Sequence, residues 1–120
     1  MKRLIFLLFT LLGYSVFMEQ GHCDAVVCAA RNGRFWLLGV EAERQCTVHV
    51  SVNARRNLER GCGVVLIVTS DELLRAAIRR QLARTLPSEM RRRVGVTTIA
   101  NIQRAIDRIQ NHANTKHQTE

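Results

Sequence analysis

The sequence predicts a single α/β domain in which helices cover a mixed sheet. Three observations lead to this fold class: a hairpin signal near residue 32, a parallel β-α-β pattern from residue 63 onward, and a length of 120 residues, which suits one hydrophobic core. The expected order of elements is α-β-β-β-α-β-α-β-α. Residues 1–111 are predicted to form the domain, and the polar tail 112–120 is expected to fray.

The first half of the chain is predicted to form a helix and then a three-strand meander. In "MKRLIFLLFTLLGYSVF" the apolar run predicts a helix over 3–12 that ends at Gly13, followed by a short strand over 14–19. The pair Asn32-Gly33 lies between two apolar runs, "CDAVVCAA" and "RFWLLGVEAE". Asn-Gly favours a two-residue hairpin loop because both positions need positive φ, so an antiparallel hairpin is expected here.

The second half alternates helices with strands. Residues 48–60 are predicted to be a helix with Val48, Val52 and Leu58 on one side and Gly61 as its stop. The next apolar run, "GVVLIVT" at 63–69, is continuous, as is typical of a buried parallel strand.

A helix, a strand and a last helix complete the chain. Ser70 is expected to cap a helix that Pro87 ends, and "RVGVTTI" predicts a short strand after it. The helix between Ser70 and Pro87 has an apolar stripe, and Arg75, Arg79 and Arg84 lie off it. The stripe comprises Leu73, Leu74, Ala77, Ile78, Leu82 and Leu86. The last helix is marked by Ile99, Ile102, Ile106 and Ile109.

The charge favours an anionic partner. Lys and Arg exceed Asp and Glu by eight, and nearly all of this positive charge is arginine. Nucleic acid is the first candidate, with DNA as the expected partner; a basic surface without a partner is the alternative. The N-terminal apolar run is too short for a membrane span, so no membrane partner is expected.

The N-terminus and the four cysteines allow two interpretations. A retained helix and small buried cysteines in a cytoplasmic protein form the main one, and the lack of a CxxC pair argues against a zinc knuckle. The alternative is a small exported protein, secreted or periplasmic. In that case a signal peptide of about 15 residues is removed and the cysteines at 23, 28, 46 and 62 are paired.

Acidic residues gather at one end of the hairpin. If Asn32 and Gly33 form its loop, Asp24 lies directly opposite Glu41, and alternation places both on one face with Glu43. Like charges in a direct cross-strand pair are destabilising. Either the strands run out into water, or an arginine of the next helix neutralises the acids, or the site holds a cation such as Mg²⁺.

This order of elements and these acids resemble the PD-(D/E)XK nuclease superfamily, which has a restriction-endonuclease-like fold. The likeness spans 14–99, and "GRFWLLGVEAER" followed by "NARRNLERGCGVVLIVTSDELL" is its most similar part. It implies a Mg²⁺-dependent endonuclease that hydrolyses DNA phosphodiester bonds. On this resemblance Asp24 and Glu41 would bind the metal, the carbonyl of Ala42 would be a third ligand, and Glu19 would be an auxiliary acid.

Position 43 departs from the resemblance, because the family's lysine would fall on Glu43. Arg55 or Arg56 can supply the missing positive charge, but an arginine is a poor proton acceptor, so Glu43 becomes the candidate base. A run of three arginines, Arg91, Arg92 and Arg93, is either a solvated turn or a phosphate contact.

Cleavage itself is therefore left open. A domain that only binds nucleic acid or a protein is one alternative, and the exported protein is the other. A homodimer, or a place within a larger host protein, also stays open.

Overall fold

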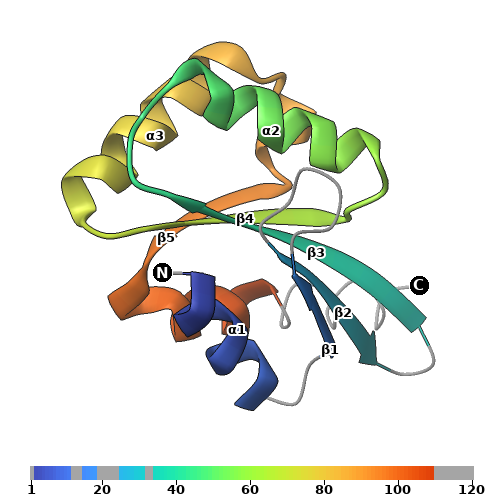
Figure 1. Cartoon of the computed structure of the whole chain (residues 1–120). Helices are drawn as coiled ribbons and strands as arrows, with labels where there is room; N and C mark the ends of the chain where they lie inside the picture. The colour runs from blue at the N-terminus through green and yellow to red at the C-terminus, as the bar shows by residue number, and fades with distance from the viewer. Residues whose placement is uncertain (1, 12–14, 19–24, 32–33, 110–120) are drawn as a thin grey trace.

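Five strands form one mixed sheet in a computed structural model that describes residues 2–11, 15–18, 25–31 and 34–109 (Figure 1). Their order across the sheet follows the sequence. The strands are β1 (Ser15–Met18), β2 (Ala25–Arg31), β3 (Arg34–Glu43), β4 (Val64–Thr69) and β5 (Val94–Thr98). The predicted α/β class and the order of strands are confirmed.

The hairpin has the predicted register. Arg31 pairs with Arg34 at its closed end, and Ala25 pairs with Val40 at the last described pair of its open end. β1 extends the antiparallel meander by pairing with β2. Asp24, which was predicted to lie opposite Glu41, is outside the described residues, as is Glu19.

From β3 onward the sheet is parallel, so each connection must cross over the sheet. α2 (Val48–Glu59) connects β3 to β4, and α3 (Glu72–Thr85) with the short α4 (Ser88–Arg91) connects β4 to β5. α4 includes Arg91, where the sequence predicted a loop. The predicted parallel β-α-β unit is confirmed.

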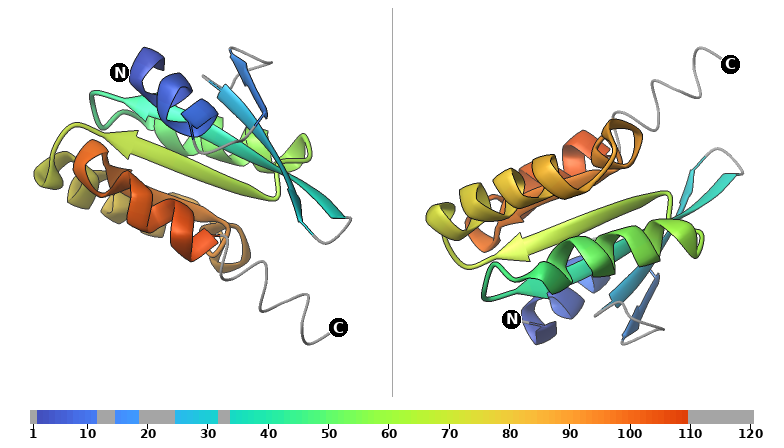
Figure 2. Two further views of the ribbon diagram at one scale, coloured as in Figure 1. Left: turned by 90° about the horizontal axis from the view of Figure 1, so that it is seen from below. Right: turned by 90° about the horizontal axis from the view of Figure 1, so that it is seen from above.

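One face of the sheet is covered by α1 (Lys2–Leu11) and by a helix at 102–109 (Figure 2). Phe9 of α1 is fully buried there, so the predicted N-terminal helix is confirmed and contributes to the core. The side of the hairpin opposite to Glu41 is apolar and faces this layer. The buried cluster comprises Phe9, Val27, Leu38, Val40, Leu66, Val68, Ile102 and Ile106.

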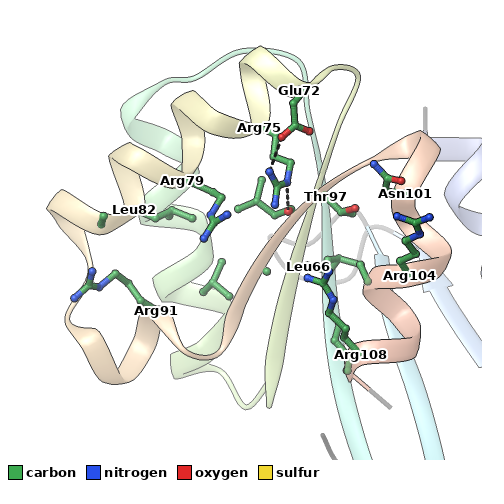
Figure 3. Close-up of a pocket in the computed structure, with 16 residues that line it drawn as sticks. Leu66, Glu72, Arg75, Arg79, Leu82, Arg91, Thr97, Asn101, Arg104 and Arg108 are labelled. Atoms are coloured by element: carbon green, nitrogen blue, oxygen red, sulfur yellow. Dashed lines mark hydrogen bonds and ion pairs between the residues drawn. The ribbon is translucent and has the colours of Figure 1, made fainter. Parts of the chain in front are cut away.

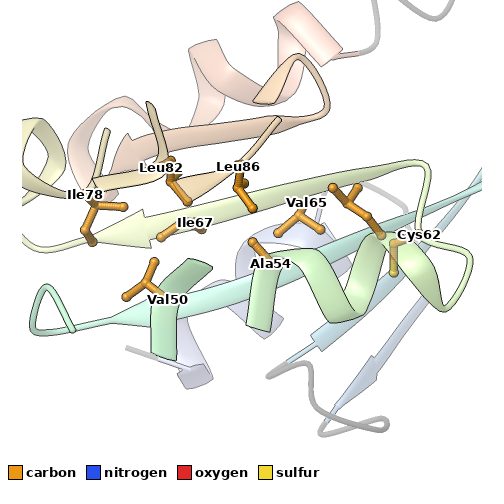
Figure 4. Packing of buried hydrophobic residues seen from close by; sticks show 9 residues of the cluster. Val50, Ala54, Cys62, Val65, Ile67, Ile78, Leu82 and Leu86 are labelled. Atoms are coloured by element: carbon orange, nitrogen blue, oxygen red, sulfur yellow. The ribbon is translucent and has the colours of Figure 1, made fainter. Parts of the chain in front are cut away.

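The other face is covered by α2 and α3 (Figures 1 and 4). Its buried cluster comprises Val50, Ala54, Leu58, Cys62, Val65, Ile67, Ile78, Leu82 and Leu86. Cys62 is thus one of the small buried cysteines that were expected, whereas Cys46 is exposed; both are free thiols, as is Cys28.

The predicted inner face of α2 is right at Leu58 and wrong at Val48 and Val52. Val48 is 69% exposed and Val52 is 45% exposed, while the buried residues are Val50, Ser51, Ala54, Asn57 and Leu58. The buried face was not recognised in the sequence because it contains two polar residues, Ser51 and Asn57. Each forms a hydrogen bond within the fold: Ser51 Oγ donates to the carbonyl of Val48 at 3.2 Å, and Asn57 donates to Glu41 on β3.

The ends of the other helices differ slightly from the sequence prediction. Asp71, not Ser70, caps α3, because its Oδ1 accepts a 2.8 Å hydrogen bond from the amide of Leu74. Leu73 was placed on the apolar stripe but is 86% exposed. Gly61 ends α2 as expected, with a positive φ of 111° that favours glycine.

Candidate functional site

Glu41 and Glu43, two of the predicted acids, lie at the end of the central strand β3, beside β4. Glu41 pairs with Ile67 and Glu43 with Thr69, so both acids belong to the carboxyl edge of the parallel part of the sheet. Ligands of open α/β sheets bind outside this edge, because loops and helix starts converge there.

Glu41 is a buried carboxylate with a defined partner. The residue is 4% exposed, and its Oε1 accepts a 2.8 Å hydrogen bond from Nδ2 of Asn57, which is itself 2% exposed. A buried charge is costly unless hydrogen bonds compensate it. Asn57 is therefore a residue that holds the Glu41 carboxylate in place from α2.

Sequence reasoning missed Asn57, although a signal existed. Asn57 lies three residues after Ala54 and seven after Val50, so it continues the buried stripe of α2. A polar residue on such a stripe needs a partner in the sheet beneath it, and Glu41 is the acid that α2 covers.

Glu43 and Ala42 follow on β3. Glu43 is half-buried and shares the face of Glu41 by strand alternation, whereas Ala42 packs against the core on the opposite face. A contact from α3 also fixes the segment just after the acids: Nε2 of Gln81 donates a 2.6 Å hydrogen bond to the carbonyl of Thr47.

The donor chemistry at this edge suits a hard divalent cation. Mg²⁺ takes oxygen ligands and often uses only one or two protein carboxylates with waters. Glu41 and Glu43 provide two, and Asp24, the other predicted ligand, lies outside the described residues. Within the described part of the chain, no group of three His, Cys, Asp or Glu residues is arranged to hold a metal ion.

The predicted nucleic-acid contacts lie on separate elements. Arg55 is exposed and Arg56 half-buried on α2, while Arg91 and Arg92 are exposed near the start of β5. The guanidinium of Arg93 is already bonded, since its Nε donates to the carbonyl of Gly63 at 3.1 Å and its Nη2 to that of Cys62 at 3.0 Å. Arg93 therefore fastens the start of β5 to the turn before β4.

A cavity of about 730 Å³ lies along β5, between α3 and the helix at 102–109 (Figure 3). Of the predicted contacts it includes only Arg91. We call it the arginine groove, after the five arginines that line it: Arg75, Arg79, Arg91, Arg104 and Arg108. The sequence showed that Arg75 and Arg79 avoid the apolar stripe, but it gave no sign that two distant helices flank the same strand.

Comparison with protein-family models, curated proteins and solved structures found no match to this chain. Among the described residues, no helix has both the length and the apolar character needed to cross a membrane. The function must therefore be inferred from the acids and the arginines themselves.

Proposed function

We propose that this chain is a DNA-binding domain whose acids at the end of β3 cleave phosphodiester bonds with the help of Mg²⁺. The observation that carries the proposal is the buried carboxylate of Glu41, held by Asn57 at the carboxyl edge of the sheet. Stability alone does not account for such a group, because apolar residues often replace buried charges with no loss of stability. Buried, oriented ionisable groups are concentrated at functional sites.

The strand arrangement supports a restriction-endonuclease-like topology. The resemblance implies an antiparallel meander, an acid on its third strand, and a crossover to a parallel fourth strand. The described pairing is antiparallel from β1 to β3 and parallel from β3 to β4, and Glu41 lies on β3.

The proposed mechanism assigns different roles to the acids. Glu41 would hold the ion with Asp24 and the carbonyl of Ala42, as the resemblance implies, and the ion would offset the negative charge of the phosphate. Asn57 keeps the Glu41 carboxylate in one position. Glu43 is less buried than Glu41 and would accept the proton of the attacking water, a role that arginine cannot fill.

A second candidate is a domain that binds DNA without cleaving it. The observation that favours it is the arginine groove, because its charge is independent of the acids. Binding without cleavage is also favoured by Glu43, which stands where the family has its lysine.

Cleavage assays with plasmid, linear duplex and single-stranded DNA, in Mg²⁺ and in EDTA, test the proposal. Glu41→Gln is expected to abolish cleavage, and Glu43→Lys to lower it by about 10²- to 10⁴-fold, the usual contribution of a general base. Glu59→Gln, a change of the same type at the exposed end of α2, serves as the control and should leave cleavage intact.

Two results would remove the acids from the mechanism: cleavage that persists in EDTA, or cleavage that survives Glu41→Gln. An increase in activity in Glu43→Lys would show that Glu43 is not the base. DNA binding by a wild-type protein that cleaves none of the three substrates would favour the second candidate.

A further inference from the structure

The arginine groove has two rows of positive charge on opposite sides of β5. Arg75 and Arg79 are four residues apart on α3, and Arg104 and Arg108 are four residues apart on the helix at 102–109. Side chains at this spacing lie on one helix face, with Cβ atoms about 5–6 Å apart. Figure 3 shows the two rows approaching the groove from either side of the β5 ribbon, with Arg91 near one end.

Most of this charge is available to a ligand. Within the described part of the chain, the guanidinium groups of Arg79, Arg91, Arg104 and Arg108 have no hydrogen bond or ion pair. Glu72, the one acid among the described residues that line the groove, is paired with Arg75 at 2.6 Å. Four cations collected in one concave surface repel one another, and a bound polyanion would relieve that repulsion.

The exposed edge of β5 is partly closed to a peptide strand. β5 is the last strand of the sheet, and Nε of Arg75 donates a 2.9 Å hydrogen bond to the carbonyl of Val96. A peptide that extended the sheet would need that carbonyl. The groove therefore suits a ligand that bonds to arginine side chains rather than to the backbone of β5.

The lining also indicates which part of a nucleic acid is recognised. Among the described residues that line the groove, none is aromatic. Proteins that hold exposed bases usually stack them on aromatic rings, whereas contacts to phosphates are made by arginine and lysine. The groove thus has the chemistry for phosphates and lacks the chemistry for stacking bases.

The groove leads toward the acids. Thr97 and Asn101 line its end at the carboxyl edge of the sheet, and Glu43, Thr69 and Thr98 form one row across β3, β4 and β5. Neighbouring strands are about 4.8 Å apart, so the backbones of Glu43 and Thr98 are separated by about 10 Å. One strand, β4, thus lies between this end of the groove and the strand that carries Glu43.

We propose that the arginine groove binds the sugar-phosphate backbone of a nucleic-acid strand, independently of sequence, and directs it toward the carboxyl edge that bears Glu41 and Glu43. The inference rests on the proposed function in taking nucleic acid as the ligand, but it does not require cleavage.

The test is fluorescence anisotropy with labelled oligonucleotides in EDTA, so that cleavage plays no part. A single strand and a duplex of the same sequence show which form provides the backbone. Binding is measured over a range of salt concentrations for the wild type and for the triple variant Arg79→Ala/Arg104→Ala/Arg108→Ala. Since each lost phosphate contact lowers the slope of log K against log salt by about 0.7 to 0.9, the triple variant should have a slope shallower by about 2 to 3.

A matched control removes the same charge elsewhere. Arg60, Arg80 and Arg84 are exposed and do not line the groove, and Arg80 and Arg84 share α3 with Arg79. Replacing these three by alanine should leave the slope near that of the wild type. Circular dichroism spectra of both triple variants check that each is folded.

The outcomes separate the groove from the acids. Equal slopes for the two triple variants would overturn the groove, and the acids would remain supported if Glu41→Gln still abolished cleavage. A shallower slope in the groove variant alone would support the groove even if the wild type cleaved no DNA. A wild-type protein that binds neither oligonucleotide would overturn both proposals.

Discussion

Asn57→Ala should destabilise the domain by removing the α2 donor to a buried carboxylate. Both partners of this 2.8 Å hydrogen bond are almost completely buried, so water can replace the lost amide only poorly. A hydrogen bond to a charged group contributes about 1.5 to 3 kcal/mol. We therefore expect the free energy of unfolding to fall by about this amount.

The corresponding change in melting temperature can be worked out from chain length. With about 2.1 cal/mol/K of unfolding entropy per residue, a chain of 120 residues has an unfolding entropy of about 0.25 kcal/mol/K. The melting temperature should then fall by about 6 to 12 °C. In a Glu41→Gln background the same substitution should cost about half as much, because the hydrogen bond is then between neutral groups.

Thermal unfolding followed by circular dichroism, on the wild type, the two single variants and the double variant, measures this coupling. Asn53→Ala is the matched control: Asn53 lies one turn earlier on α2, is half-buried, and has no side-chain hydrogen bond within the described part of the chain. The change in helix propensity is the same in both alanine variants. If Asn57→Ala melts like Asn53→Ala, or costs as much in the Glu41→Gln background, the carboxylate is not held as described.

Three further predictions concern the scaffold and can be checked by urea denaturation. Asp71→Ala removes the cap of α3 and should cost about 0.5 to 2 kcal/mol; an unchanged midpoint would mean that the bond to Leu74 contributes nothing. Ile78→Ala empties a fully buried position and should cost about 2 to 5 kcal/mol, whereas Leu73→Ala on the same helix should change stability by less than about 0.5 kcal/mol. Arg93→Ala breaks two bonds to the turn before β4 and should cost about 1 kcal/mol, and a cost no greater than that of Arg92→Ala would contradict its fastening role.

The hairpin was predictable because its register is set locally. The Asn32-Gly33 pair predicted a two-residue loop, and the register that follows from it pairs Arg31 with Arg34, as the structure has it. The inner face of α2 was not predictable from apolar spacing, since it contains Ser51 and Asn57. Their burial depends on partners elsewhere in the fold, and for Asn57 that partner is Glu41, sixteen residues away.

The two candidate sites differ in the same way in how far the sequence predicts them. Glu41 and Glu43 stand out in the sequence because two acids end an apolar run. The arginine groove is built from α3, from β5 and from the helix at 102–109, and no spacing within one segment relates Arg79 to Arg104. Only the packing of these helices on opposite faces of the sheet brings the two rows to one edge.

The hydrogen bond from Gln81 to the carbonyl of Thr47 joins α3, one wall of the arginine groove, to the segment that follows the acids of β3. Thr47 belongs to the segment that leaves the acids, and Gln81 lies two residues after Arg79 on α3. The Oε1 atom of Gln81 is buried and has no hydrogen-bond partner within the described part of the chain, so one polar atom of this side chain is unsatisfied. A shift of α3 would have to break this bond or pull on the loop after β3. A movement of α3 that keeps this bond therefore also moves the segment that follows Glu41 and Glu43.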